Sequence, residues 1–297
     1  MRFAISIPQF YADGEFDPAA FRSYLRRAEE LGFHSGWTQE QILGTMPVLG
    51  PIETMTYAAA CTERLRLGCA VFVTPLHNPV HLAKSIATLD QLSRGRVEVG
   101  IGAGGRGRPF GAFGHDGEGL VARFTEGLTV MRELWTRPEV TLDGRFWQLA
   151  GASIEPRPFQ KPGPPVWFGG SHPNALRRAV RLGDGFFGAG STTTEKFAEQ
   201  VRVVRAEGRA DFPIAKRIYI AVDDDGDRAR KQIADGLAAI YRKRGLENVA
   251  VAGTPAECVR GVQEVVDAGA ELILFTTVAD QAKQMERLAA EVMPQVS

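Results

Sequence analysis

Short apolar segments alternate with longer amphipathic segments along the whole chain. Residues 96–101 alternate apolar with polar or small side chains, a pattern typical of a half-buried strand. Residues 78–92 instead repeat leucine and isoleucine at helical spacing, and Asn78 followed by Pro79 suits the start of a helix. The chain therefore indicates repeated strand–helix units.

Eight such units are predicted from end to end. The expected strands are residues 2–8, 35–38, 67–73, 96–101, 165–168, 185–187, 218–222 and 272–276. Parallel strands need helical crossovers, and eight crossovers of one hand close naturally into a (β/α)8 TIM barrel. An open doubly wound sheet is the alternative, but Ile7-Pro8-Gln9-Phe10 stands where its dinucleotide-binding glycines would be.

Two segments interrupt this pattern. Residues 102–119 are rich in glycine and follow a strand, so they are expected at the catalytic face of the barrel, where they would form a lid. Residues 139–148 resemble a small hairpin with Asp143-Gly144 as its turn. No composition shift marks a linker, so residues 1–297 are expected to form one barrel domain with these insertion segments.

Composition narrows the classes of function. Lys+Arg and Asp+Glu both number 35, so the net charge is zero and gives no electrostatic case for nucleic acid or an anionic membrane. The cysteines Cys61, Cys69 and Cys258 are sparse and form no metal-ligand spacing, which suits a reducing cytoplasm. No leader peptide, membrane-spanning run or metal motif is expected.

In a barrel, the residues just past each strand share one face. Those positions are 9–10, 38–41, 70–75, 102–106, 169–172, 188–191, 223–225 and 276–277.

Three groups of residues at or near these positions could bind a ligand or take part in catalysis. Gly169, Gly170 and Ser171 precede a helix, so their amides suit a phosphate; the alternative is an ordinary turn capped by Ser171. The glycines within residues 100–105 admit a flat ligand or form a flexible loop. Glu40 can orient or protonate a bound ring, or it is a solvated carboxylate. His77 lies near the same mouth.

Ordered motifs over nearly forty residues carry a family resemblance. Residues 66–75 (RLGCAVFVTP), followed by Asn78-Pro79, residues 93–96 (SRGR) and residues 99–102 (VGIG), resemble the luciferase-like monooxygenase family. Residues 165–170 (PVWFGG) resemble its phosphate-binding unit. The resemblance covers essentially the whole chain, and the spacing is most similar to the subfamily that uses the deazaflavin coenzyme F420.

The resemblance implies a set of cofactor positions. Family members often have a non-proline cis peptide in the third strand beneath the cofactor ring, which would fall here at Ala70-Val71. Ala103 and Gly104 match positions lining the cofactor, and Gly169 with Gly170 match amides that hold its phosphate.

One departure from the family concerns proton transfer. Many relatives have an acid followed by histidine after the second strand, whereas this chain has Glu40-Gln41. Glutamine cannot act as a base near neutral pH. Glu40, Gln41 and His77 are therefore the candidates at the catalytic position.

The resemblance implies a cytoplasmic, homodimeric oxidoreductase that moves hydride between F420 and a small organic substrate. From their charge and position in the sequence, Arg106 and Arg108 are expected to meet the acidic tail of that cofactor. An FMN-dependent monooxygenase that uses oxygen is the close alternative. A non-catalytic protein that binds flavin or deazaflavin is the other, because Gln41 replaces the usual histidine.

Overall fold

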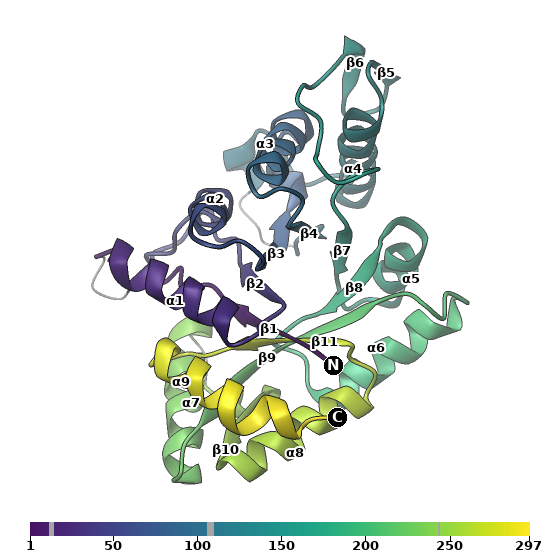
Figure 1. Ribbon diagram of the computed structural model, residues 1–297. Helices are drawn as coiled ribbons and strands as arrows, with labels where there is room; N and C mark the ends of the chain where they lie inside the picture. Colours follow the sequence, from purple (N-terminus) through teal and green to yellow (C-terminus); the bar gives the residue numbers. More distant parts are fainter. Residues whose placement is uncertain (12–14, 106–109, 243) are drawn as a thin grey trace.

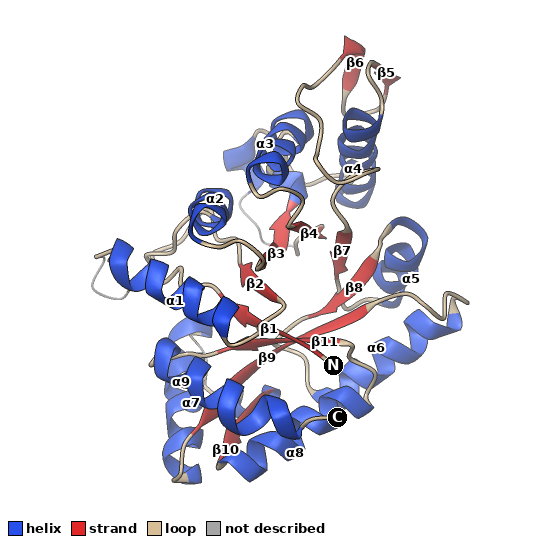
Figure 2. Cartoon of the chain, viewed as in Figure 1, coloured by secondary structure: helices blue, strands red, loops and turns tan. Residues whose placement is uncertain are grey.

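The computed structural model describes residues 1–297 except 12–14, 106–109 and 243. Within the described residues, eight parallel strands close into a barrel in the order β9-β11-β1-β2-β3-β4-β7-β8, with β8 pairing back to β9. Helices surround these strands on the outside (Figures 1 and 2). The predicted (β/α)8 TIM barrel is confirmed.

The strands are β1 Arg2–Ser6, β2 Ser35–Thr38, β3 Arg66–Val73, β4 Val97–Gly102, β5 Val140–Asp143, β6 Gln148–Ala152, β7 Val166–Gly169, β8 Gly185–Gly188, β9 Ile214–Val222, β10 Ala250–Gly253 and β11 Leu272–Thr276. The α-helices are α1 Pro18–Glu30, α2 Pro51–Cys61, α3 Pro79–Leu92, α4 Leu120–Thr136, α5 Pro173–Leu182, α6 Thr194–Ala206, α7 Gly226–Tyr241, α8 Pro255–Asp267 and α9 Gln281–Arg287.

Side-chain caps set several of the helix starts. Asp17 accepts hydrogen bonds from two amides of α1, and Asn78 does the same for α3. Thr254 and Glu257 form a reciprocal capping box at α8. Each of these three caps is followed by proline, whose fixed φ and missing N–H suit the first helical turn. The local sequence thus fixes where the chain turns from strand to helix.

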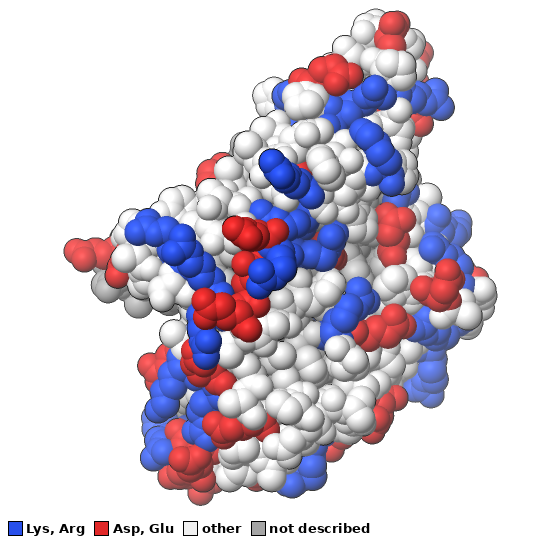
Figure 3. Space-filling model, viewed as in Figure 1, with Lys and Arg blue, Asp and Glu red and all other residues white. Residues whose placement is uncertain are grey.

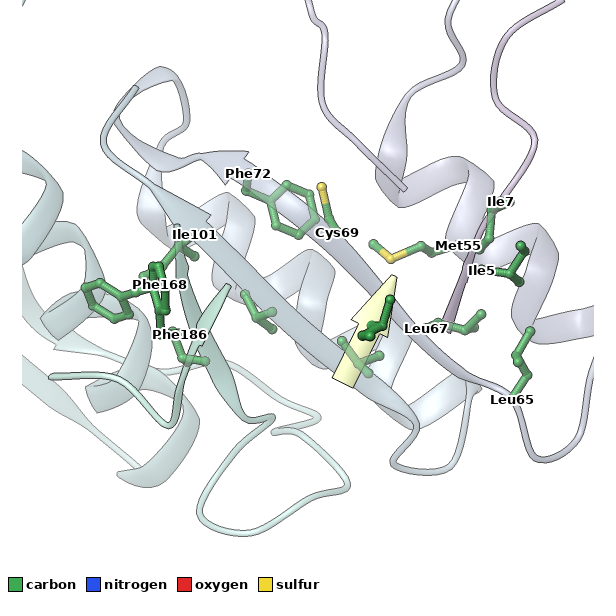
Figure 4. Packing of buried hydrophobic residues seen from close by; sticks show 14 of the residues in the cluster. Ile5, Ile7, Met55, Leu65, Leu67, Cys69, Phe72, Ile101, Phe168 and Phe186 are labelled. Atoms are coloured by element: carbon green, nitrogen blue, oxygen red, sulfur yellow. The ribbon is translucent and has the colours of Figure 1, made fainter. Parts of the chain in front are cut away.

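The core has two layers separated by the barrel wall. Residues such as Leu67, Phe72 and Ile101 point outward and pack against the helices, and Figure 4 shows Met55 of α2 beside the β3 residues. A second, smaller layer fills the barrel interior with Ala4, Trp37, Trp167, Phe187, Ala215, Leu272 and Leu274. The inner layer closes the barrel below its mouth, so it is a packed core rather than a channel.

The hairpin prediction is partly wrong. Its strands are β5 and β6, and residues 144–147 connect them in place of a two-residue turn at Asp143-Gly144. Glu126 of α4 accepts hydrogen bonds from the amides of Arg145, Phe146 and Trp147. This carboxylate satisfies three donors of the wider turn, which the local sequence does not reveal.

The seventh barrel strand was also predicted incorrectly. β9 begins at Ile214 rather than residue 218; its first half closes the barrel and its second half pairs with β10, a strand that was not predicted. The adjacent cations Lys216 and Arg217 conceal the start of the strand. Because β9 continues beyond the barrel, residues 223–225 do not line the mouth cavity defined below; Asp225 instead caps α7.

Lys216 is a buried cation on the outer side of β9. Its ammonium donates hydrogen bonds to the carbonyl oxygens of Ala189 and Thr192, the latter at 2.8 Å, and lies 5.6 Å from the centre of the Phe197 ring. Burial, together with the guanidinium of Arg217, lowers the pKa of Lys216 to about 7. Lys216 therefore holds the loop between β8 and α6 at an electrostatic cost.

Acidic and basic side chains are interspersed over the face shown in Figure 3, as expected for zero net charge. No helix in the described part of the chain is long and apolar enough to span a bilayer.

Gly100→Ala is expected to destabilise the barrel by about 3 kcal/mol, because a Cβ at this position would lie 2.1 Å from the backbone oxygen of Cys69. Urea denaturation measures the change in unfolding free energy. Gly111→Ala is the matched control, since a Cβ there meets no atom within 4 Å. Equal stability of the two variants would contradict the close approach of β3 to β4.

Lys216 is expected to make the unfolding free energy depend on pH between about 7 and 9. Its folded-state pKa is about 7, below the ordinary value of the unfolded chain, so the unfolded state binds more protons in this range. Stability relative to Lys216→Met should thus rise with pH, by at most about 1.4 kcal/mol per pH unit, and level off below pH 7. Chemical denaturation at several pH values tests this, with the exposed Lys231→Met as control; parallel curves for wild type and Lys216→Met would refute it.

Candidate functional site

Glu40 and His77 form a hydrogen-bonded pair at the mouth of the barrel. Glu40 follows β2, and its side chain is only 2% exposed. One carboxylate oxygen accepts the amide of Val73 at 2.7 Å, and the other lies 2.7 Å from His77 Nε2. The 3-10 turn after β3 positions His77, whose ring contacts Phe72 edge-on. A carboxylate joined to an imidazole can hold a proton and pass it on.

Gln41 is not part of this pair. Its side chain folds over the next loop, so a Cβ on Gly44 would lie 1.9 Å from Gln41 Nε2. Among the described contacts, the Gln41 amide has no hydrogen bond to either Glu40 or His77. The structure therefore brings two of the three catalytic candidates together and leaves the third beside them.

The β3 backbone is irregular at Ala70 and Val71. The peptide between them is cis, as the family resemblance predicted, and the pairing of β3 with β4 skips both residues. Ala70 packs against the interior aromatic layer. Val71 lies against Gly102 of β4 and Gly169 of β7, where an added Cβ would come within 2.9 Å of its methyl carbons. Three strands meet here because two of them lack side chains.

The segment after β4 continues this surface. Ala103 packs partly against the outer core, and Gly104 adopts a positive φ of 74° that favours glycine. Further along, His115 Nε2 lies 2.8 Å from the carbonyl oxygen of Pro75, which joins the segment to the loop after β3. The predicted tail-binding residues Arg106 and Arg108 lie outside the described residues.

A cavity lies where α5 and α6 begin, and it is named here the α5–α6 cavity. It has a volume of about 1160 Å³, including space open to solvent. Its lining includes Gly170, Ser171, Pro173, Leu176, Ala189, Ser191, Thr192, Lys196, Glu199, Gln200 and Val203.

This cavity suits an anion. Two helix N-termini meet at it, capped by His172 and Thr193, so the predicted alternative of a Ser171 cap is wrong. Lys196 supplies a cation, and Lys216 fixes the loop carrying Ser191 and Thr192 from behind. Among the described atoms, the buried Gln200 Oε1 has no hydrogen-bond partner. The polar groups leave room for a ligand with hydrogen-bonding oxygens.

Another cavity, named here the mouth cavity, lies between the barrel strands β1, β2, β9 and β11 and the helix α7. Its volume is about 860 Å³, including space open to solvent. It is lined by Ser6, Ile7, Gln9, Phe10, Trp37, Thr38, Gln39, Met46, Val48, Arg217, Gly236, Ala239, Ile240, Leu274, Thr276, Thr277, Val278 and Gln281. Six of them lie at the strand-end positions predicted from the sequence, namely Gln9, Phe10, Thr38, Gln39, Thr276 and Thr277; the others, Ser6 and Arg217 among them, do not. Arg217 was missed because β9 was predicted to begin after it.

Ala70 and Val71 are not among the described residues that line these two cavities. They lie on β3, which pairs with β2 on one side and β4 on the other. The end of β2 borders the mouth cavity, and β4 pairs with β7, which leads to the α5–α6 cavity. The strand order thus arranges mouth cavity, β3 irregularity and α5–α6 cavity around one barrel end. No three His, Cys, Asp or Glu side chains of the described residues gather as a metal site.

Comparison with known proteins agrees with this architecture. A monooxygenase, RslO1 from Streptomyces bottropensis, superposes with a TM-score of 0.84 at 24% identity, over 99% of both chains. A coenzyme F420-dependent tetrahydromethanopterin reductase from Methanopyrus kandleri superposes with a TM-score of 0.83 at 19% identity, over 100% of this chain and 99% of that one. At these identities the likeness establishes the fold.

Sequence comparison extends further. An F420-dependent glucose-6-phosphate dehydrogenase from Beutenbergia cavernae is 29% identical over 324 aligned positions, which cover 95% of this chain and 94% of that protein. The family model for luciferase-like monooxygenases matches residues 1–247. The chain therefore belongs to the luciferase-like monooxygenase family.

Proposed function

We propose that the protein is an oxidoreductase that transfers hydride between coenzyme F420 and a small organic substrate. The relative from Beutenbergia cavernae, which aligns over nearly the whole chain, is named as F420-dependent. The observation that carries the proposal is the α5–α6 cavity, because a phosphorylated cofactor needs an anion site at the same barrel end as its redox-active ring.

The residues around that cavity fit a cofactor phosphate. The amides of Gly170 and Ser171 lie at the start of α5, where the helix dipole favours negative charge. Lys196 adds a positive charge at the first turn of α6. The hydroxyls of Ser191 and Thr192 complete the set of donors. Gly169, at the end of β7, leads from this cavity to the β3 irregularity.

The surface around Val71 fits a planar ring. Ala70, Val71, Ala103 and Gly104 carry small side chains or none, so they present backbone and methyl groups to a flat ligand. Because Gly102 and Gly169 have no side chains, the methyl groups of Val71 pack directly against the backbone of β4 and β7. We therefore assign Ala70, Val71, Ala103, Gly104, Gly169, Gly170 and Ser171 as cofactor contacts. When bound, F420 supplies the hydride chemistry, while the protein supplies binding and orientation.

The Glu40–His77 pair is proposed to manage the proton that accompanies hydride transfer. Glu40 is nearly inaccessible, and the Val73 amide fixes one of its oxygens. His77 is more exposed, at 22% of its side chain, so it can exchange a proton with substrate or solvent. The pair thus takes the proton-transfer role of the histidine that many relatives carry at the position of Gln41. Gln41 itself is not hydrogen-bonded to the pair.

Several coarser properties are proposed with this function. We propose that residues 1–297 work as one domain, that two copies form a homodimer, and that the enzyme acts in the cytoplasm on a small molecule. Size-exclusion chromatography with light scattering tests the dimer.

Titration of the purified protein with four cofactors tests the function. F420 is expected to bind more tightly than its ribityl deazaflavin fragment, which lacks both the phosphate and the acidic tail, by at least about tenfold. FMN and riboflavin differ in the phosphate alone, so this pair measures the contribution of the phosphate on a flavin ring. Exclusive binding of FMN would overturn the F420 assignment in favour of the monooxygenase alternative. Binding of F420 without turnover of any substrate would favour the non-catalytic alternative.

Lys196→Gln should weaken binding of F420 and FMN about tenfold but leave riboflavin unchanged, because only the first two carry phosphate. Lys283→Gln, an exposed change on α9, is the matched control. Fluorescence titration measures the dissociation constants of these three ligands for each variant. Equal weakening of riboflavin would show that Lys196 does not act on the phosphate.

Glu40→Gln and His77→Gln should each lower kcat about 100-fold or more, with little change in the dissociation constant of the cofactor, because they remove proton transfer and not binding. His81→Gln changes an exposed histidine on the following helix and should keep wild-type kcat. Steady-state kinetics and cofactor titration separate the two effects. Wild-type kcat in both Glu40 and His77 variants would remove the pair from the mechanism.

A further inference from the structure

The mouth cavity combines apolar walls with a single charge. Phe10, Met46, Val48, Ile240 and Val278 form much of its lining, and Phe10 remains 46% exposed at the rim. Of the described lining residues, Arg217 is the only one that carries a charge. Such a cavity favours a ligand that is mostly apolar and has one acidic group.

Hydrogen bonds hold Arg217 in a fixed orientation and leave some of its N–H groups without a partner among the described atoms. Its Nε donates to Thr276 Oγ1 at 3.0 Å, and its Nη1 donates to Gln39 Oε1 at 2.9 Å. The guanidinium also lies over the Tyr219 ring, 5.0 Å from the centroid. Among the described atoms, Nη2 has no hydrogen-bond partner. A guanidinium fixed on one side presents its remaining N–H groups to an oxyanion.

Gln39 is itself anchored, so this orientation is built into the wall. The backbone amide of Gln39 donates to Gln9 Oε1 at 2.6 Å. Gln9, which is 4% exposed, donates in turn to the carbonyl oxygens of Gln39 and Leu49. The Gln9–Gln39–Arg217–Thr276 chain therefore joins β1, β2, β9 and β11 around the cavity.

Two hydroxyls in the same cavity lack partners. Ser6 Oγ and Thr277 Oγ1 are buried, line the cavity, and make no hydrogen bond within the described structure. Thr277 is 3% exposed. Buried polar atoms are normally satisfied, so two unsatisfied hydroxyls beside an arginine indicate a place for ligand oxygens.

We propose that the mouth cavity binds apolar monocarboxylates, with the carboxylate at Arg217 and the hydroxyls of Ser6 and Thr277. This inference rests on the proposed function, because it names the substrate class of the same redox site. It differs from a sugar phosphate, because one guanidinium among mostly uncharged lining residues matches a singly charged carboxylate better than a phosphate that is close to doubly charged. The proposal therefore predicts weaker binding of the sugar phosphate named for the Beutenbergia relative.

Calorimetric titration of the purified full chain, with and without saturating F420, tests this substrate class. The probes are trans-cinnamate, its neutral amide trans-cinnamamide, and glucose 6-phosphate. Cinnamate should bind at least about tenfold more tightly than cinnamamide, because only cinnamate pairs with Arg217, and glucose 6-phosphate should bind more weakly than cinnamate.

Variants locate the carboxylate. Arg217→Met should weaken cinnamate at least about tenfold, whereas the exposed Arg202→Met should not change it. Because Arg217 also holds Gln39 and Thr276, the double variant Ser6→Ala/Thr277→Val provides a second test that removes no existing hydrogen bond of these hydroxyls. It should weaken cinnamate severalfold while thermal unfolding stays unchanged.

Three results would overturn the inference: no binding of cinnamate, tighter binding of glucose 6-phosphate, or cinnamate affinity unchanged in both folded variants. The outcome is separable from that of the proposed function. If F420 fails to bind while Arg217-dependent cinnamate binding persists, the redox assignment fails and the carboxylate site stands. If F420 binds and cinnamate does not, the carboxylate site fails and the redox assignment stands.

Discussion

The approach of β3 to its neighbours at Ala70 and Val71 is the constraint on which the rest of the site depends. At Gly100 the backbone oxygen of Cys69 occupies the space of a side chain, and at Gly102 and Gly169 the Val71 methyl groups do. Glycine at these positions is therefore a requirement of packing between strands, not of loop flexibility. The result is a smooth wall on one side of the barrel end.

Polar groups are distributed around that wall in three places with different characters. The Glu40–His77 pair lies after β2 and β3, and a cation and two helix starts border the α5–α6 cavity. Arg217 stands in the mouth cavity beside β1 and β11, among lining residues that are otherwise uncharged in the described structure. The proposed proton transfer, phosphate binding and substrate binding need these different environments. The packed aromatic layer below keeps all three at one barrel end.

The sequence predicts the parts of this arrangement that local chemistry determines. Proline after Asp17, Asn78 and Thr254 marks helix starts. The glycines of β4 were predicted to admit a flat ligand or to form a flexible loop, whereas the structure shows that Gly100 and Gly102 let β3 approach β4. Arg217 and Ser6 could not be found in this way, because their function depends on which strand end borders which cavity. The hidden start of β9 at two adjacent cations, and the wide hairpin turn held by Glu126, are likewise consequences of tertiary contacts that the local pattern does not encode.

A crystal structure of the protein with bound F420 tests the central claim most directly. The account predicts the cofactor ring against Val71, its phosphate within hydrogen-bond distance of Gly170, Ser171 and Lys196, and open space between the ring and Arg217. A phosphate held elsewhere on the barrel, or side chains occupying the volume above Val71 where the ring belongs, would contradict it.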